Sequence, residues 1–167
     1  MSFVVWLTGL SGSGKSAIAS ELVRLLPQAS RLESDVMRTQ LTPQADYGDA
    51  DRDFFYGALA DIAHLLYERD RPVVVDATAN RRSYRDAARR RIARFAEVYV
   101  DTPLEVCAAR DPKGLYRSAR ALPGVQAPYE PPLAPELVVH GDRGTPRDAA
   151  GEILALLESR GWLDLRQ

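Results

Sequence analysis

The segment Phe3-Val4-Val5-Trp6-Leu7-Thr8-Gly9-Leu10-Ser11-Gly12-Ser13-Gly14-Lys15-Ser16 decides the fold of this chain. Its apolar first half predicts a buried strand, and residues 9–16 match the phosphate-loop pattern G-x-x-x-x-G-K-[ST] directly after that strand. Glycines let the backbone curve around a polyphosphate with its N–H groups pointing inward, and the helix that follows adds the positive end of its dipole. The segment therefore predicts a site for a nucleoside triphosphate.

The polar groups of this loop have expected partners. Lys15 reaches the β- and γ-phosphates, and the Ser16 hydroxyl is placed to bind Mg²⁺, a hard cation that prefers oxygen ligands. We therefore expect ATP and Mg²⁺ as cofactors, with Lys15 also acting in catalysis. The loop positions expected to hold the phosphates through their backbone are Gly9, Ser11, Gly12, Ser13 and Gly14.

The composition is that of one globular domain. The 167 residues are 46% hydrophobic, which predicts a single domain over residues 1–167 with a substantial core. A net charge of −1 argues against a protein held on nucleic acid by overall charge, so the expected partner is a small molecule. The first residues lack the features of a signal peptide and no apolar run has the length of a membrane span, so we expect a cytoplasmic protein without membrane association.

Strand and helix patterns alternate along the chain. This alternation predicts an α/β fold with a parallel sheet of about five strands, helices on both faces, and ligands beyond the carboxyl ends of the strands. The expected strands are residues 3–7, 30–33, 72–75, 96–100 and 137–139. The expected helices are residues 16–26, about 51–68, 81–94, and one that opens at Thr145-Pro146 and ends at Gly161.

Two carboxylates follow predicted strands. Asp35 and Arg38 form a D-x-x-R pair that suits phosphoryl transfer, because the carboxylate can take the proton of an acceptor hydroxyl or hold magnesium, and the guanidinium can grip an anionic substrate. Asp76 ends the strand at 72–75 and is a second candidate metal ligand. Asn80, in the turn that follows, is a candidate substrate-binding residue. The residues alone leave the catalytic base open between Asp35 and Asp76.

A lid is expected over about residues 110–135. Residues 123–135 hold five of the eleven prolines and must form a loop. Four cations lie within eleven residues just before it, an arrangement suited to closing over phosphates and excluding water. We assign Arg110 to the cofactor, and Lys113, Arg117 and Arg120 to the substrate.

The predicted helix at 81–94 carries seven arginines and a single acid, Asp86. Such a run can bind the phosphates of nucleic acid, but on an amphipathic helix it more often forms a solvated face. We favour the solvated face. Nucleic acid is thereby the less favoured partner.

The chain resembles adenylylsulfate kinase over most of its length. The resemblance is strongest in Val100-Asp101-Thr102-Pro103-Leu104-Glu105-Val106-Cys107 and Arg110-Asp111-Pro112-Lys113-Gly114-Leu115-Tyr116, with Ala119-Arg120 and Pro128-Tyr129-Glu130 after them. It implies a five-stranded parallel fold, magnesium dependence and a homodimer. It also implies that Asp35 lies near the acceptor hydroxyl, that Arg38 and Arg52 contact the phosphosulfate group, that Lys113 is a lid lysine, and that Tyr47 takes the place of an adenine-stacking phenylalanine.

Three departures from the family pattern concern the acceptor. Phe55 stands where the family has an asparagine, and it cannot replace the hydrogen bonds of that amide. Residues 78–81 replace a family segment that contains a serine, and residues 121–127 are shorter than the family stretch that carries a second adenine-stacking phenylalanine. Residues 73–80 instead resemble the strand and turn of polynucleotide-kinase-like ATPases.

We therefore predict transfer of the γ-phosphoryl group of ATP to a hydroxyl, with the 3′-hydroxyl of adenosine 5′-phosphosulfate (APS) as the leading acceptor. The alternative acceptors are a polynucleotide 5′-end, a nucleoside or a small antibiotic. A different class of function, a nucleotide-binding regulator with slow ATP hydrolysis, also remains open.

Overall fold

The five strands form one parallel sheet in the computed structural model of the chain, which describes residues 2–118 and 122–164. The strand order is β2-β3-β1-β4-β5, so the predicted fold class is confirmed. The strands are β1 (Val4–Thr8), β2 (Ser30–Glu33), β3 (Val73–Asp76), β4 (Phe95–Asp101) and β5 (Leu137–His140). The helices are α1 (Lys15–Leu25), α2 (Ser34–Leu41), α3 (Asp49–Glu68), α4 (Arg82–Arg89), α5 (Leu104–Arg110), α6 (Leu115–Ser118) and α7 (Pro146–Ser159).

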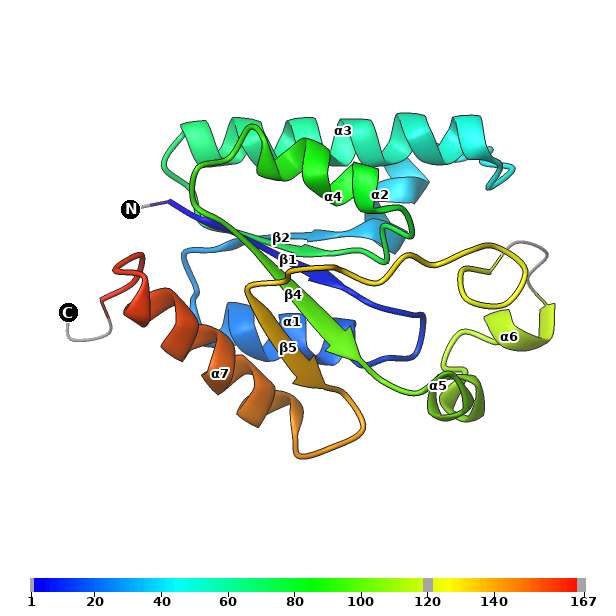
Figure 1. Ribbon diagram of the computed structural model, residues 1–167. Coiled ribbons are helices and arrows are strands. Elements are labelled where there is room, and N and C mark those ends of the chain that lie inside the picture. Colours follow the sequence, from blue (N-terminus) through cyan, green and yellow to red (C-terminus); the bar gives the residue numbers. More distant parts are fainter. Residues whose placement is uncertain (1, 119–121, 165–167) are drawn as a thin grey trace.

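Helices cover both faces of the sheet. Figure 1 shows α1 and α7 on one face and α2, α3 and α4 on the other, with α5 and α6 beyond the carboxyl ends of the strands. Strand β1 lies at the centre and its side chains alternate between the two cores, Val5 and Leu7 facing α1 and α7, Val4 and Trp6 facing α3. Burial on both faces explains why the strand is apolar without interruption.

Strand β1 pairs with β3 on one side and with β4 on the other. The register sets Leu7 beside Asp76 and Thr8 beside Tyr99. Since all three strands are parallel, the phosphate loop after β1 begins next to the end of β3. This pairing brings residues 9–16 and Asp76 to the same edge of the sheet.

The helix expected at 81–94 is shorter than predicted. Helix α4 ends at Arg89, and a turn in which the N–H groups of Arg91 and Ile92 both donate to the carbonyl of Ala88 leads into β4. Ile92 and Phe95 are buried as the helical pattern suggested, but they lie in the turn and at the start of the strand. The chain must reverse here to enter the sheet, so the apolar spacing runs past the end of the helix.

The predicted start of the last helix is confirmed. The Thr145 hydroxyl accepts a hydrogen bond from the Asp148 N–H at 3.2 Å, and the Asp148 carboxylate accepts one from the Thr145 N–H at 2.8 Å. Two of the free N–H groups at the helix start are satisfied in this way. None of the helices in the described part of the chain has the length and apolarity to cross a membrane.

Candidate active site

A cavity of about 940 Å³ lies at the carboxyl ends of the strands. Its walls come from the phosphate loop, the start of α2, the loop before α3 and the α5–α6 region. The residues proposed from the sequence that line it are Ser11, Gly12, Gly14, Lys15, Ser16, Asp35, Arg38, Tyr47, Arg52, Asp76, Arg110 and Lys113. Segments distant in the sequence therefore meet around one space.

The phosphate loop requires glycine for steric reasons. Gly12 has φ of 78°, and a Cβ there would lie 2.8 Å from the Cys107 carbonyl oxygen. Gly9 and Ser13 stand outside the lining of the cavity. A Cβ at Gly9 would lie 2.6 Å from the Val100 carbonyl oxygen, and the Ser13 carbonyl accepts a hydrogen bond from the Thr102 hydroxyl at 2.8 Å. Both residues hold the loop against β4 and the turn after it.

Lys15 folds back over the loop. Its Nζ donates to the carbonyl oxygens of Gly9 at 2.8 Å and Leu10 at 2.7 Å. Burial lowers the pKa of Lys15 to about 8, although the nearby Asp76 carboxylate acts in the opposite direction. A buried ammonium at the entrance of α1 is thus placed where phosphate oxygens would meet it.

Ser16 and Asp76 touch each other. The Ser16 hydroxyl donates to the Asp76 carboxylate at 2.8 Å, and Arg31 donates to the same carboxylate oxygen at 2.9 Å. A hydroxyl and a carboxylate fit Mg²⁺, which takes few protein ligands and completes its shell with water and phosphate oxygens. The described residues contain no cluster of three or more His, Cys, Asp or Glu side chains suited to a metal ion.

Asp35 and Lys113 form an ion pair across the cavity. Asp35 lies in the first turn of α2, and Lys113 lies between α5 and α6. Both side chains are about half exposed. Burial lowers the pKa of Lys113, and the carboxylate of Glu33 opposes that shift. The ion pair joins the proposed catalytic carboxylate to the proposed lid.

Arg38 and Arg52 line the same side of the cavity. The Arg38 guanidinium donates to Asp51 at 3.3 Å, and Arg52 is 6% exposed. Tyr47, in the loop between α2 and α3, lines the cavity with φ of 60°, and its side chain is half exposed. Two cations and an aromatic ring therefore gather opposite the phosphate loop.

The segment expected as a lid packs against the phosphate loop. Arg110, at the end of α5, donates to the carbonyl oxygens of Gly12 at 3.3 Å and Gly141 at 2.8 Å. The Tyr116 hydroxyl donates to the Ser11 carbonyl oxygen at 2.6 Å. Two helices, α5 and α6, stand before the proline-rich loop, and the sequence interpretation had not included them.

Two proposed substrate residues in the described part of the chain do not join the cavity lining. Asn80 is 2% exposed and donates from Nδ2 to the Pro128 carbonyl at 2.9 Å, so it fastens the proline-rich part of the expected lid. Arg117 pairs with Asp111 at 3.3 Å and its side chain is largely exposed. Arg120 lies outside the described residues. The structure thus places Asn80 and Arg117 in structural contacts.

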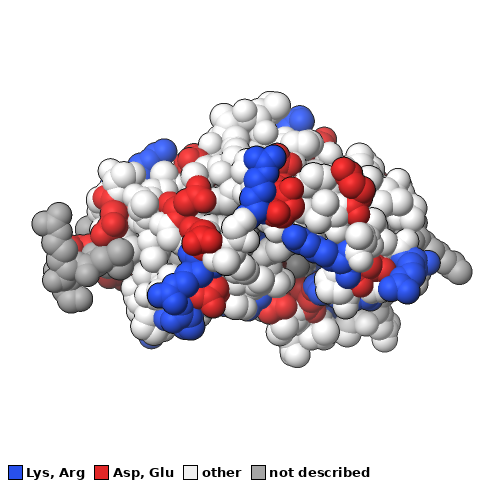
Figure 2. Space-filling view, turned by 90° about the horizontal axis from the view of Figure 1, so that it is seen from below, with Lys and Arg blue, Asp and Glu red and all other residues white. Residues whose placement is uncertain are grey.

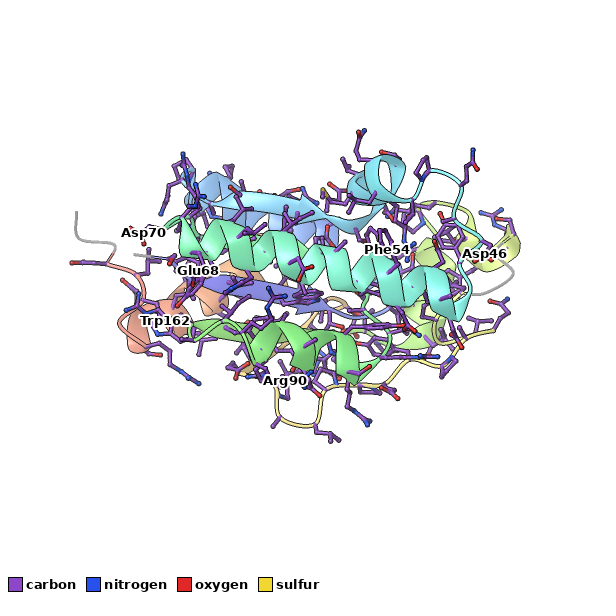
Figure 3. The ribbon with its side chains drawn as sticks, turned by 90° about the horizontal axis from the view of Figure 1, so that it is seen from above. Asp46, Phe54, Glu68, Asp70, Arg90 and Trp162 are labelled. Atoms are coloured by element: carbon purple, nitrogen blue, oxygen red, sulfur yellow. The ribbon has the colours of Figure 1, made fainter. Side chains whose placement is uncertain are left out.

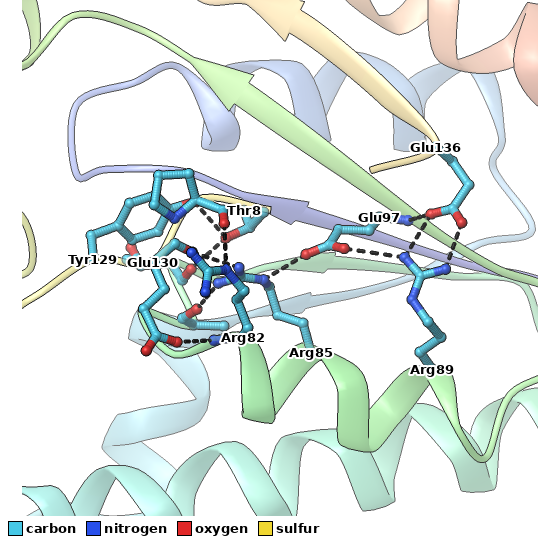
Figure 4. A network of polar contacts seen from close by, with 11 residues as sticks. Thr8, Arg82, Arg85, Arg89, Glu97, Tyr129, Glu130 and Glu136 are labelled. Atoms are coloured by element: carbon cyan, nitrogen blue, oxygen red, sulfur yellow. Dashed lines mark hydrogen bonds and ion pairs between the residues drawn. The ribbon is translucent and has the colours of Figure 1, made fainter. Parts of the chain in front are cut away.

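Two arginines of α4, Arg85 and Arg89, do not belong to a solvated face. Arg85 is 1% exposed, and its Nε donates to Glu97 on β4 at 2.5 Å. Arg89 pairs with Glu97 at 3.1 Å and with Glu136 before β5 at 2.5 Å. Figure 4 shows this chain of contacts running from α4 across β4. The interpretation is corrected for Arg85 and Arg89, because acids from other elements neutralise them and periodicity within one helix cannot reveal those partners. Arg90 and Arg91, just after α4, are exposed as the solvated face requires.

The network also reaches the proline-rich part of the expected lid. Arg85 donates to the Glu130 carbonyl at 2.6 Å, and the Tyr129 hydroxyl lies 3.0 Å from the Thr8 hydroxyl at the end of β1 (Figure 4). On the face that carries α1 and α7, basic and acidic side chains are interspersed (Figure 2). Neither observation adds weight to the polyanion alternative.

Several residues that line the cavity escaped the sequence interpretation. Glu33 and Thr78 follow from topology, because they lie at or just after the carboxyl ends of β2 and β3. Leu122 and Pro123 carry no such pattern, and they reach the cavity because the start of the proline-rich segment lies beside it. The remaining lining residues are Ala17, Ser34, Asp46, Tyr56, Pro112, Leu115 and Ser118.

The sequence pattern of the adenylylsulphate kinase family matches residues 1–140. The chain belongs to this family. It is 38% identical to the adenylyl-sulfate kinase of Halothermothrix orenii over 96% of this chain and 92% of that relative. It is 39% identical to the adenylyl-sulfate kinase of Rippkaea orientalis, over 95% and 93% of the two chains.

The APS kinase of Mycobacterium tuberculosis, solved in complex with AMPPNP and APS, superimposes with a TM-score of 0.87 at 38% identity, covering 94% of this chain and 98% of that one. A gluconokinase from Sinorhizobium meliloti shares the fold alone, with a TM-score of 0.67 at 20% identity over 95% and 93% of the two chains. The chain is an ATP-dependent kinase, as its family and its structural relatives indicate. Membership in the adenylylsulphate kinase family favours a kinase over the nucleotide-binding regulator with slow ATP hydrolysis that the sequence had left open.

Proposed function

We propose that this adenylylsulphate kinase transfers the γ-phosphoryl group of ATP to the 3′-hydroxyl of APS, with Mg²⁺ bound beside the phosphates. The observation that carries the proposal is the single cavity that holds the phosphate loop, the Asp35–Lys113 pair and the arginines of α2 and α3. Donor and acceptor sites within one space give the proximity that phosphoryl transfer needs. The similarity to a kinase solved with AMPPNP and APS supports this choice of substrates.

The donor half uses the phosphate loop. The N–H groups of residues 11–16 surround the polyphosphate, and Lys15 leaves the loop carbonyls to reach the β- and γ-phosphates. Ser16 and Asp76 would hold Mg²⁺, which neutralises charge on the phosphate oxygens. Arg110 lies over the loop next to Gly141 and belongs to the same half.

The acceptor half centres on Asp35. Asp76 is engaged by Ser16 and Arg31, whereas the ion pair of Asp35 with Lys113 opens onto the cavity, so we assign Asp35 as the base. Asp35 takes the proton of the 3′-hydroxyl, the oxygen bonds to the γ-phosphorus, and the bond to the β-phosphate oxygen breaks to release ADP. Before this step, the approaching acceptor displaces Lys113 from Asp35, and Lys113 moves to the phosphates.

The anionic end of the acceptor lies against Arg38 and Arg52 in this proposal, with its adenine near Tyr47. Bidentate contacts from a guanidinium suit a phosphosulfate group, which offers several oxygens in fixed geometry. The homodimer and the cytoplasmic location expected from the sequence stay predictions.

Acceptor profiling tests the proposal. The purified protein is incubated with Mg²⁺ and ATP labelled on the γ-phosphate, together with APS, a 5′-hydroxyl oligonucleotide, a nucleoside or an aminoglycoside antibiotic. We expect label in APS with one ADP released per molecule modified. Label in another compound while APS stays unmodified would refute the acceptor assignment. ADP release that ignores every acceptor would favour the regulator.

A further inference from the structure

Three aromatic rings surround the guanidinium of Arg38. Its central carbon lies 4.0 Å from the centroid of the Phe55 ring, 4.9 Å from that of Tyr47 and 5.7 Å from that of Tyr56. Each distance is within the range of a cation–π contact. The shortest of the three is to Phe55, which is fully buried. Arg38 itself lines the cavity, so the ring supports from the core a cation that faces the ligand space.

Helix α3 presents two groups to this cation. Asp51 and Phe55 are four residues apart and therefore lie on one face of the helix, a turn from each other. Asp51 accepts a hydrogen bond from Arg38, and Phe55 contacts the guanidinium through its ring. The next face of the helix sends Arg52 and Tyr56 into the cavity wall. On this face of α3, one charge and the nearest of the three rings thus hold the side chain of Arg38.

The geometry leaves donors for a ligand. A guanidinium has five N–H groups, and the hydrogen bond to Asp51 is the one Arg38 makes within the described residues. A ring against the guanidinium holds its position without using any N–H donor. An asparagine, as the family pattern has at this position, would contact the acceptor or the arginine through an amide. Phenylalanine can act only through the cation.

We propose that Phe55 is a positioning residue for the acceptor: its ring holds the Arg38 guanidinium in the cavity wall so that the free N–H groups meet the acceptor's anionic group. This inference rests on the proposed function, because it takes an anionic acceptor as given. Phe55 does not reach the cavity itself, so its effect passes through Arg38.

The test compares two neighbouring phenylalanines. Phe55→Leu removes the ring under Arg38, and Phe54→Leu removes a ring that is 62% exposed on the same helix. Figure 3 shows Phe54 on α3 at the end of the molecule where Asp46 and the loop before the helix lie. We expect Phe55→Leu to raise the KM of the acceptor roughly fivefold, the scale of a cation–π contact of about 1 kcal/mol, with kcat and the KM of ATP unchanged. Phe54→Leu changes none of the three.

A double-mutant cycle separates positioning from packing. In an Arg38→Met background the ring has no cation to hold, so adding Phe55→Leu should leave acceptor binding as it is in Arg38→Met alone. An equal fold-change in both backgrounds would overturn the proposal, as would an unchanged acceptor KM or a matching rise in the KM of ATP. Phe55→Met, which fills the core with a flexible side chain, serves if Phe55→Leu does not fold.

Failure of the Phe55 inference can be distinguished from failure of the proposed function. The KM is measured for whichever anionic compound gains label in the acceptor panel. Label in a compound other than APS refutes the APS assignment, while the coupling between positions 38 and 55 is still read on that compound. If no compound gains label, the dissociation constant of APS is measured by calorimetry on the same variants, and absence of coupling there overturns the inference.

Discussion

The carboxylate of Asp35 pairs with the ammonium of Lys113 across the cavity, although one begins α2 and the other lies in the region between α5 and α6. The Asp35 carboxylate on one wall of the cavity and the Lys113 ammonium on the other wall therefore neutralise each other. In the proposed function, an acceptor that approaches Asp35 displaces Lys113, and the freed lysine becomes available to anionic oxygens. The proposal therefore couples entry of the acceptor to movement of the segment expected as a lid.

Asp35→Asn should abolish most of the activity. The amide cannot take the acceptor proton, and general base catalysis contributes roughly 10²- to 10⁴-fold, so we expect kcat to fall by about that factor while ATP still binds. Steady-state ADP release and calorimetric titration with ATP measure the two effects. Asp61→Asn, on the exposed side of α3, is the control and should keep full activity. A kcat near that of the wild type would move the base to another group.

Lys15→Met should abolish turnover and alter the pH dependence of stability. The pKa of Lys15 is lowered to about 8 in the folded chain, below the usual value of 10.5, so the unfolded chain holds more protons between these values. The cost of burying the charge, on the order of 3 kcal/mol, is present below pH 8 and disappears as pH rises toward 10.5.

The pH effect is measured by urea unfolding of both proteins. The stability of Lys15→Met relative to the wild type should be highest near pH 7 and should decline between pH 8 and 10.5. A difference that stays constant over this range would show that the ammonium is not buried as the structure has it. Full turnover by the variant would contradict the donor site.

Ser16→Ala should weaken the binding of Mg²⁺ that supports catalysis. The variant loses one oxygen ligand and the contact that orients Asp76, so we expect the Mg²⁺ concentration for half-maximal rate to rise about tenfold, the loss that follows removal of a metal-supporting group. Rate measurements against Mg²⁺ concentration give the value. Ser20→Ala lies one turn further along α1 and makes no contact with Asp76 in the described structure, so it is the matched control. Equal Mg²⁺ profiles for both variants would exclude Ser16 as a ligand.

Arg85→Met should destabilise the fold strongly. The substitution leaves Glu97 without its closest partner in a buried setting, and such a broken pair costs about 3–5 kcal/mol. Arg91→Met breaks the exposed pair with Asp61 and should cost less than about 1 kcal/mol. Urea unfolding of both variants gives the comparison. A similar small loss for both would mean that Arg89 alone suffices for Glu97.

The sequence predicted correctly those features that depend on a few consecutive residues. The phosphate loop, the buried strands and the capping box at Thr145 each depend on a few consecutive residues, and the structure contains all three. Helix α4 ended early because apolar spacing does not distinguish the end of a helix from the turn that follows. The length of an element depends on where the chain must reverse, which is a property of the sheet.

Local sequence patterns could not predict which partner each charged side chain contacts. Arg85 looked like its exposed neighbours, yet the acid that neutralises it lies on β4, and Asn80 looked like a site residue although it fastens Pro128. Arg117 stands among the lid cations but turns to Asp111. A side chain in such a run can face solvent, core or ligand, and the neighbouring element decides which.

The amino-acid sequence by itself determined the parallel sheet, the phosphate loop and the family, because backbone curvature around a phosphate and burial of consecutive apolar residues are fixed by residue type over short distances. Only the tertiary structure decided that Asp35 meets Lys113, that Ser16 meets Asp76, and that Arg38 sits on the ring of Phe55. These contacts join elements far apart along the chain, and their geometry depends on how the helices pack across the sheet.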